Sequence, residues 1–245
     1  MFASVCVRMC VCVHEPTAPT PPLDIPAPRS IPPTPHCPQV PHSKLVGLSA
    51  AADFVGLPEL SQRSADEAIA GLDASNAALT LQQAEQRGVQ RVREASLQVV
   101  LDEFGAVCET SGFMRELSVE LVCEVIGRDE LRVEREEVVF EAVLRWLGGA
   151  GVAGRGRTEA TRVLKLVRFP LMAGLYLGTE VAKCDAGCVA GLQVLQTLMV
   201  EALGYQAIMA GRGAAGMEAA MEAGVVERSV RTRPRRGMGL DAGKM

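Results

Sequence analysis

The sequence contains few aromatic residues, little histidine and no long apolar run. Aromatic residues make up 4% of it, and its three histidines, His14, His36 and His42, all lie within residues 1–44. Because Ser-His-Asp and Cys-His catalysis both need a histidine in the folded part, neither can be placed there. No apolar run reaches the roughly 20 residues that span a bilayer. The sequence therefore predicts neither an enzyme nor a membrane partner.

The chain also has a small net charge. The formal net charge of −4 implies no bulk attraction to nucleic acid or to a membrane surface. Five arginines gather between residues 228 and 236, and such a cluster can bind nucleic acid or act as a nuclear signal. No aromatic residue is interleaved with them, so a solvated linker or tail is favoured. We expect no nucleic-acid partner and a cytoplasmic location, with the nucleus as an alternative.

Eight cysteines could suggest a disulfide framework, but their setting favours free thiols. Cys108 and Cys123 lie within apolar helical pattern, as buried thiols do in a reduced, cytosolic protein. The C-x3-C-x-C-x-H cluster of Cys6–His14 and the pair in Cys184–Cys188 both lack the second ligand pair of a standard zinc site. The glycine-rich segment Gly148–Arg157 lacks the strand and the Lys-Ser/Thr pair of a phosphate loop. No metal and no other cofactor is expected.

The segment Met1–Lys44 differs from the rest in its proline content. Eleven of the fourteen prolines lie in it, and each one fixes φ and removes a backbone donor. We therefore expect a disordered segment with polyproline II character. It could offer a PxxP site to an SH3-type groove, but a passive tail is favoured because PxxP is common in such tracts. Met1–Val13 lacks the basic region and cleavage site of a signal peptide.

From Leu45 onward the composition is that of a helical protein. Ala, Leu, Glu, Gln, Met and Arg predominate in the second half, and no strand pattern occurs. Apolar spacing, cap residues and helix-stopping glycines locate the expected helices. Besides the central segment described next, they cover residues 45–57, 59–72, 77–87, 89–107, 118–126, 158–167, 171–183 and 185–209.

The segment Asp129–Gly149 has the clearest pattern. Glu136 and Glu137 occupy a first helical turn, where carboxylates face the positive end of the helix dipole. A wide apolar arc follows, and a helix with such an arc is buried against several neighbours. This helix should therefore lie in the middle of a helical domain, with Phe140 and Trp146 in the core.

The same segment carries a narrow polar stripe. Glu137, Glu141 and Arg145 recur at four-residue spacing, and the rest of the helix is apolar. We expect the paired carboxylates of the segment Asp129–Glu141, Glu136 among them, to lie on a solvated stripe without an apolar pocket. Nothing there would push two carboxyl pKa values apart, so no acid–base site is expected.

Several short motifs occur in a fixed order along the chain. They comprise Asp129, Glu130, Leu131, Val133, Glu136, Val139, Phe140, Ala142 and Trp146, then Arg168, Phe169, Pro170 and Leu171, and finally Tyr205. They resemble the BACK domain of BTB–BACK–kelch proteins, whose signature runs D-E-L-x-V-x-S-E-x-x-V-F-x-A-x-x-x-W and whose later turn reads V-R-F-P-L. Residues 72–77 resemble the entry to its first helix, residues 231–235 the linker into a kelch propeller, and residues 51–60 the last helices of a BTB domain.

The chain departs from the family pattern at three places. Arg135 stands where the family prefers a serine cap, which removes a side-chain acceptor at a cost of about 1 kcal/mol. Ala173-Gly174 replaces a common Ser-Pro, and Gln206 replaces a common histidine.

The resemblance implies an all-α, antiparallel helical domain of the BACK type between disordered N- and C-terminal tails. The expected parts are a proline-rich tail over 1–44, residual BTB-like helices over 45–72, a BACK domain over 73–209 and a flexible basic tail over 210–245. Most of a BTB domain, with its dimer surface, and all kelch blades are expected to be missing. Dimerisation is therefore not expected.

The family implies a non-catalytic substrate adaptor for a cullin-3 RING ubiquitin ligase. Its partners would be a cullin, contacted by the helices of about Leu48–Val107, and a substrate, contacted through the missing propeller. Leu79, Leu81 and Val92 are the expected cullin-facing residues. The alternatives are a helical scaffold of a cytoskeletal, actin-associated protein and a fragment without independent activity.

Overall fold

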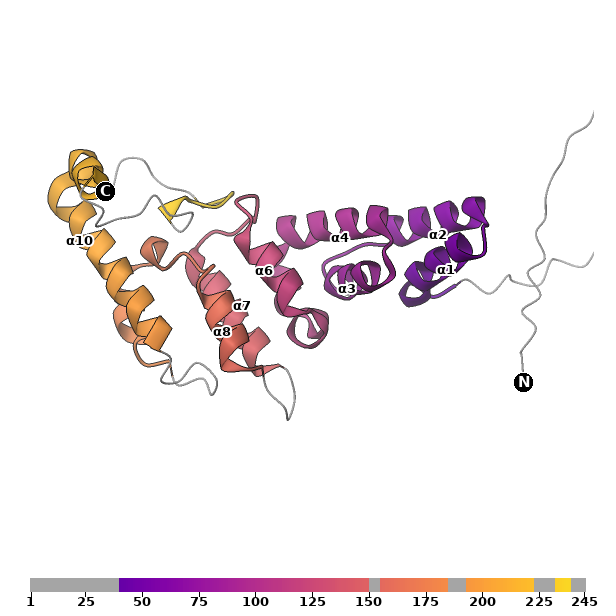
Figure 1. Ribbon diagram of the computed structural model, residues 1–245, viewed down its shortest axis with the longest axis horizontal. Coiled ribbons are helices and arrows are strands. Elements are labelled where there is room, and N and C mark those ends of the chain that lie inside the picture. Colours follow the sequence, from indigo (N-terminus) through magenta and orange to yellow (C-terminus); the bar gives the residue numbers. More distant parts are fainter. Residues whose placement is uncertain (1–39, 150–154, 185–192, 223–231, 239–245) are drawn as a thin grey trace, which may run out of the picture. The chain divides into compact units, whose positions relative to one another are not determined.

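Every regular element of the described chain is helical (Figure 1). The computed structural model describes residues 40–149, 155–184, 193–222 and 232–238. The predicted all-α class is confirmed. Of the described helices, none is long and apolar enough to cross a membrane. The proline-rich segment through residue 39, its cysteine cluster, Cys188 and the arginines at 228 and 231 lie outside the described residues.

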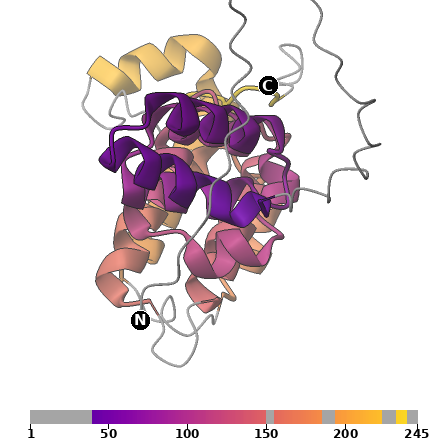
Figure 2. The same ribbon diagram turned by 90° about the vertical axis from the view of Figure 1, so that its right-hand side faces the viewer.

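The first four helices form two antiparallel hairpins, visible in Figures 1 and 2. Helix α1 (His42–Phe54) packs on α2 (Pro58–Ala70), and α3 (Ala77–Arg87) packs on α4 (Gln90–Asp102). They share a small core of their own, because α1 and α2 present short side chains at buried positions. It consists of Leu45, Val46, Ala65, Ala68, Ala84 and Val92.

The boundaries of these helices follow their end residues. Helix α3 has its predicted bounds, and Gly88 ends it with φ at +69°, a left-handed conformation that favours glycine. Helix α1 begins before the predicted start at Leu45, and His42 Nε2 lies 2.9 Å from the carbonyl oxygen of Ala68. The predicted helix over 89–107 is two helices, because the backbone leaves helical geometry at Glu103 before α5 (Phe104–Val107).

A second, larger core surrounds α6 (Val119–Gly127), α7 (Glu136–Gly148) and α8 (Arg157–Leu164). Ser118 Oγ accepts a hydrogen bond from the backbone N–H of Leu121, which confirms the predicted cap of α6. The π-helical turn η1 (Gly112–Glu116) contacts both α3 and α7, so it joins the first hairpins to this core.

Helix α7 is the central helix that its sequence predicts. Phe140 and Trp146 are each 1% exposed. The Trp146 indole N–H donates to the carbonyl of Leu117 at 3.0 Å, so its only polar atom is satisfied. Gly148 ends the helix, and a Cβ on Gly149 would lie 2.5 Å from the carbonyl oxygen of Met114, so only glycine fits there.

The last part of the domain is a chain of short turns followed by one long helix. The turns are η3 (Phe169–Leu171), α9 (Gly174–Tyr176) and η4 (Leu177–Val181), and the helix is α10 (Gln193–Glu222). The predicted last helix extends past Met209 to Glu222, and its predicted start lies outside the described residues.

Helix α10 packs on the turn η3, and one polar side chain also links the two. The amide of Gln206 donates to the carbonyls of Met172 at 2.6 Å and Pro170 at 3.3 Å. These carbonyls lie in and next to a short helical turn that leaves them without helix partners. Gln206 thus ties two segments together at a position where the resemblance expected histidine.

Replacing Trp146 by alanine should lower the free energy of unfolding by about 3–5 kcal/mol, because it removes a fully buried aromatic and opens a cavity in the larger core. Urea unfolding followed by circular dichroism measures the change. A loss below about 1 kcal/mol would contradict a central position of α7.

Candidate functional site

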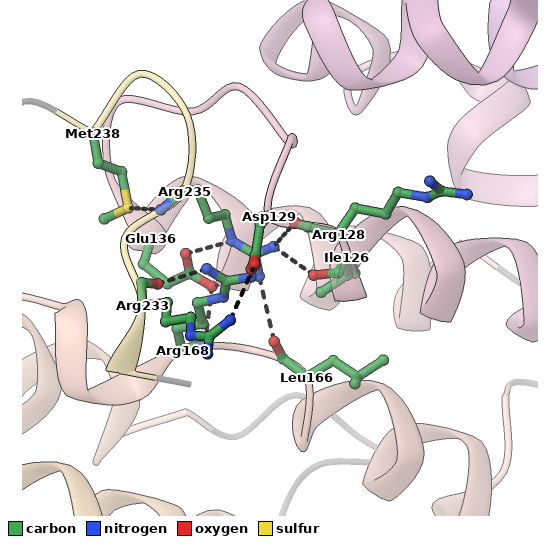
Figure 3. A network of polar contacts seen from close by, with 9 residues as sticks. All are labelled: Ile126, Arg128, Asp129, Glu136, Leu166, Arg168, Arg233, Arg235 and Met238. Atoms are coloured by element: carbon green, nitrogen blue, oxygen red, sulfur yellow. Dashed lines mark hydrogen bonds and ion pairs between the residues drawn. The ribbon is translucent and has the colours of Figure 1, made fainter. Parts of the chain in front are cut away.

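Arg235 is inserted between the carboxyl end of α6 and the amino end of α7 (Figure 3). It belongs to residues 232–238, which we call the C-terminal strap. Arg235 is 3% exposed and Glu136 is fully buried. Two parallel bonds join them, from Arg235 Nε to Glu136 Oε2 at 2.8 Å and from Nη2 to Oε1 at 2.9 Å. Such a bidentate pair is the strong form of an arginine–carboxylate contact.

The remaining donors of Arg235 bind backbone carbonyls. Nη1 donates to Ile126 and, at 2.9 Å, to Arg128, while Nη2 donates to Leu166 at 3.3 Å. Ile126 lies in the last turn of α6 and Arg128 is its C-cap, so these carbonyls lack helical partners. A cation there also complements the helix dipole. All five N–H donors of the guanidinium are therefore used.

Glu136 is the residue on which the other segments meet. It opens α7, where a negative charge faces the positive end of the helix dipole. Its Oε1 also accepts the backbone N–H of Arg168 at 2.8 Å. One carboxylate thus fixes the start of α7, the segment before η3 and the strap.

A second ion pair lies beside the first. The Arg168 side chain is 1% exposed, and its Nη2 donates to Asp129 Oδ1 while its Nη1 donates to the carbonyl of Arg233 in the strap. Burial, and then the charge of Arg235, lower the pKa of Arg168, and Asp129 opposes that shift. Two buried arginines can lie this close because Glu136 and Asp129 each carry a compensating charge.

The strap also pairs with the loop between α6 and α7 through its backbone. The N–H of Arg236 donates to the carbonyl of Asp129, and the carbonyl of Arg236 accepts from the N–H of Val133, both at 3.1 Å. Gly237 has φ at +89°, and a Cβ on it would lie 3.2 Å from Arg132 Cγ. The strap therefore needs glycine at this position.

Two predictions about charge are wrong. Glu136 and Glu137 are not on a solvated stripe, since Glu137 is 7% exposed and its Oε1 accepts the N–H of Ala173 at 2.8 Å. Arg235 is not part of a solvated tail. Both errors share one cause, which is that the partners lie far apart along the chain. Arg235 lies 99 residues from Glu136 and Ala173 lies 36 residues from Glu137, so no local pattern connects them.

The family-signature residues divide into three structural groups. Asp129, Glu136 and Arg168 belong to the polar network just described. Glu130 is exposed, and Leu171 and Tyr205 are half-buried. The rest are buried apolar residues: Leu131, Val133, Val139, Phe140, Ala142, Trp146, Phe169 and Pro170. In this chain these residues therefore contribute packing and one ionic junction. In the described residues, no group of His, Cys, Asp and Glu side chains could hold a metal.

The residues expected to face a cullin lie mostly inside the protein. Leu81 and Val92 are fully buried, which excludes their side chains as contacts in this conformation, and Leu79 is half-buried. Exposed apolar side chains lie instead at the turn between α1 and α2, where Phe54 is 92% exposed and Val55 63%. The sequence pattern marked the apolar residues of α3 and α4 but not which of them the packing would cover.

Glu141 of the predicted stripe contacts Tyr176, a tyrosine whose pKa is raised. The Tyr176 hydroxyl donates to Glu141 Oε1 at 3.2 Å. Burial, and then the charge of Glu141, raise the pKa of Tyr176 to about 12. Because the folded pKa exceeds the value of about 10 in an unfolded chain, this contribution to stability is present below pH 10 and is lost as the pH rises toward 12.

Replacing Glu136 by glutamine should lower the free energy of unfolding by about 3–5 kcal/mol, because the buried Arg235 loses its countercharge. The matched control is Glu141→Gln on the same helix, whose contact with Arg145 at 3.6 Å is partly exposed and whose loss should cost about 0–1 kcal/mol. Equal costs in urea unfolding would contradict the role of Glu136.

In a chain carrying Tyr205→Phe, Tyr176 is the only phenol, and its ionisation can be followed by ultraviolet absorbance. The midpoint should lie near pH 12, and adding Glu141→Gln should move it down, because the neighbouring negative charge is removed. A midpoint near pH 10 in the folded chain would show that Tyr176 is not held as described.

Residues 78–182 match the family model BACK, described as "BTB And C-terminal Kelch". Kelch-like protein 41 of Mus musculus is 37% identical over 95 residues, which cover 39% of this chain and 15% of that protein. Kelch-like protein 35 of Mus musculus is 32% identical over 127 residues, which cover 52% of this chain and 22% of that protein.

Kelch repeat and BTB domain-containing protein 8 of Danio rerio is 29% identical over 136 residues, covering 55% of this chain and 22% of that protein. The chain thus spans less than a quarter of the length of these relatives. The model match and the relatives agree with the motifs and with the helical fold. Residues 78–182 of this chain are thus a BACK domain, similar to a segment of kelch-like and BTB-containing proteins.

Proposed function

We propose that this chain is a non-catalytic interaction module of a substrate adaptor for a cullin-3 RING ubiquitin ligase. The observation that carries the proposal is the match of residues 78–182 to the BACK model, together with relatives named as kelch-like and BTB-containing proteins. The helices make two hairpins and a central core, an arrangement suited to presenting surfaces rather than to chemistry. This role would place the chain in the cytoplasm.

The turn between α1 and α2 is the surface we assign to the cullin. Phe54, Val55 and Leu57 are exposed by 92%, 63% and 47%, and large apolar side chains gathered at one exposed turn mark interaction sites. A shallow groove of about 620 Å³ adjoins this turn and is lined by residues of α1, α2, the end of α3 and the start of α4. The polar rim of the groove includes Asp53 and Arg87, so apolar and charged contacts are both available.

The C-terminal strap serves the other task of an adaptor, which is to hold its parts in a fixed relation. The buried pair of Arg235 with Glu136 and the two backbone bonds of Arg236 fix the course of the chain where it leaves the BACK domain. A side chain with all its donors bound cannot rotate freely, so the direction of the strap is set by the domain.

The test is a pull-down of the whole chain with the amino-terminal region of cullin-3. Replacing Phe54 by aspartate should weaken binding about tenfold or more, because the change puts a charge into an apolar contact. The matched control is Leu175→Asp, which changes an 80% exposed leucine in α9, far along the chain from the proposed surface, and should leave binding unchanged.

Absence of binding by the whole chain, also after fusion to a complete BTB domain, would contradict the cullin assignment. Equal losses for the two aspartate variants would contradict the assignment of the surface to the α1–α2 turn.

A further inference from the structure

We propose that the BACK domain contains a peptide-binding site that recognises an arginine side chain at the start of a turn, and that the strap is its occupant in this structure. The site, here called the arginine pocket, is formed by Glu136 and the carbonyls of Ile126, Arg128 and Leu166 (Figure 3). The inference does not rest on the proposed cullin role, because it concerns a different face and a ligand of different chemistry.

The pocket and its occupant come from different parts of the chain. The groups that form the pocket lie between residues 126 and 166, inside the segment 78–182 that matches the BACK model, whereas Arg235 lies beyond that segment. The domain thus supplies the complete recognition surface, and the strap supplies only the group that fills it. This division is the one found between a binding site and its ligand.

The chemistry of the pocket selects arginine over lysine. Its four acceptor groups bind all five N–H donors of the planar Arg235 guanidinium, two of them in a parallel pair to Glu136. Lysine has three donors on one atom and no planar fork, so it would leave a helix-end carbonyl or a carboxylate oxygen of Glu136 unpaired. A buried acceptor without a partner is costly, and this cost provides the discrimination.

The backbone contacts define the rest of the recognised pattern. Arg236, the residue after the inserted arginine, pairs with the loop between α6 and α7. Its N–H donates to the carbonyl of Asp129, and its carbonyl accepts from the N–H of Val133. The next residue is Gly237, whose positive φ and closeness to Arg132 exclude a side chain. The N–H of Met238 donates to the carbonyl of Arg235 at 3.3 Å, so residues 235–238 form a turn. The ligand class is therefore a peptide that carries the pattern Arg-x-Gly in a turn.

The neighbouring arginines provide an internal comparison. The side chains of Arg233 and Arg236 are 72% and 62% exposed, and they reach Asp129 and Asp102 at 4.0 and 3.4 Å. These are loose surface contacts, so Arg235 is the one of the three arginines whose side chain the pocket binds. The identity of the other two side chains should matter little for binding.

The experiment tests whether the strap binds the arginine pocket as a separate peptide. The protein is the full chain with Arg235→Ala, which leaves the pocket without its guanidinium, and the ligand is a synthetic peptide of residues 232–238. Fluorescence anisotropy of the labelled peptide should show saturable binding to this variant. Binding to the unchanged chain should be about tenfold weaker or more, because the tethered strap competes at a high effective concentration.

Two altered peptides form the matched pair. The peptide with Arg235→Lys should bind about tenfold more weakly or worse, since its ammonium cannot satisfy the carboxylate and the three carbonyls. The peptide with Arg236→Lys should bind as the original does. Adding Glu136→Gln to the Arg235→Ala chain should also abolish binding of the original peptide.

Three results would overturn the proposal. The first is absence of peptide binding by an Arg235→Ala chain whose circular dichroism and cooperative unfolding show that it is folded. The second is equal binding of the two lysine-containing peptides, which would show attraction by charge alone. The third is failure of the Arg235→Ala chain to fold, which would make the strap a part of the folding core rather than the occupant of a site.

Discussion

The bond between Arg235 and Glu136 decides where three distant parts of the chain meet. Glu136 opens α7, Arg235 caps the carboxyl end of α6, and the N–H of Arg168 binds the same carboxylate. Each charge faces the helix end of opposite sign, so the two helix dipoles lower the cost of burying the pair. Without Arg235 the junction would contain the uncompensated charge of Glu136 and several carbonyls that lack partners.

A buried ion pair is a better device for fixing geometry than for adding stability. The cost of removing two charges from water offsets much of their attraction, and an apolar replacement of the same volume can be as stable. A fully satisfied guanidinium, however, permits few alternative positions for the strap. This explains how a segment of seven residues, 232–238, can hold a defined course with few apolar contacts of its own.

How much of this could be predicted from the sequence depends on the distance between partners. Local patterns predicted the helices well, including the bounds of α3, the Ser118 cap and the core positions of Phe140 and Trp146. The break at Glu103 was missed because the apolar spacing continues through it.

The junction itself could not be predicted from local pattern. Glu136 has the position of an ordinary first-turn carboxylate, and Arg235 lies in a basic run that resembles a solvated tail. Only the fold brings them together, so neither their burial nor the recognition of Arg235 has a signal in the nearby residues. The resemblance to BACK domains marks Glu136 as a signature residue, and in this chain its carboxylate binds Arg235 and the N–H of Arg168.

The most direct test of the central claim is a double-mutant cycle on Glu136→Gln and Arg235→Gln, with the free energy of unfolding measured for both single variants and the double variant. Residues in one buried ionic contact should show a coupling of about 2–3 kcal/mol, with the double variant more stable than the sum of the single losses implies. Additive losses, within about 0.5 kcal/mol, would show that the two residues act independently and would contradict the account.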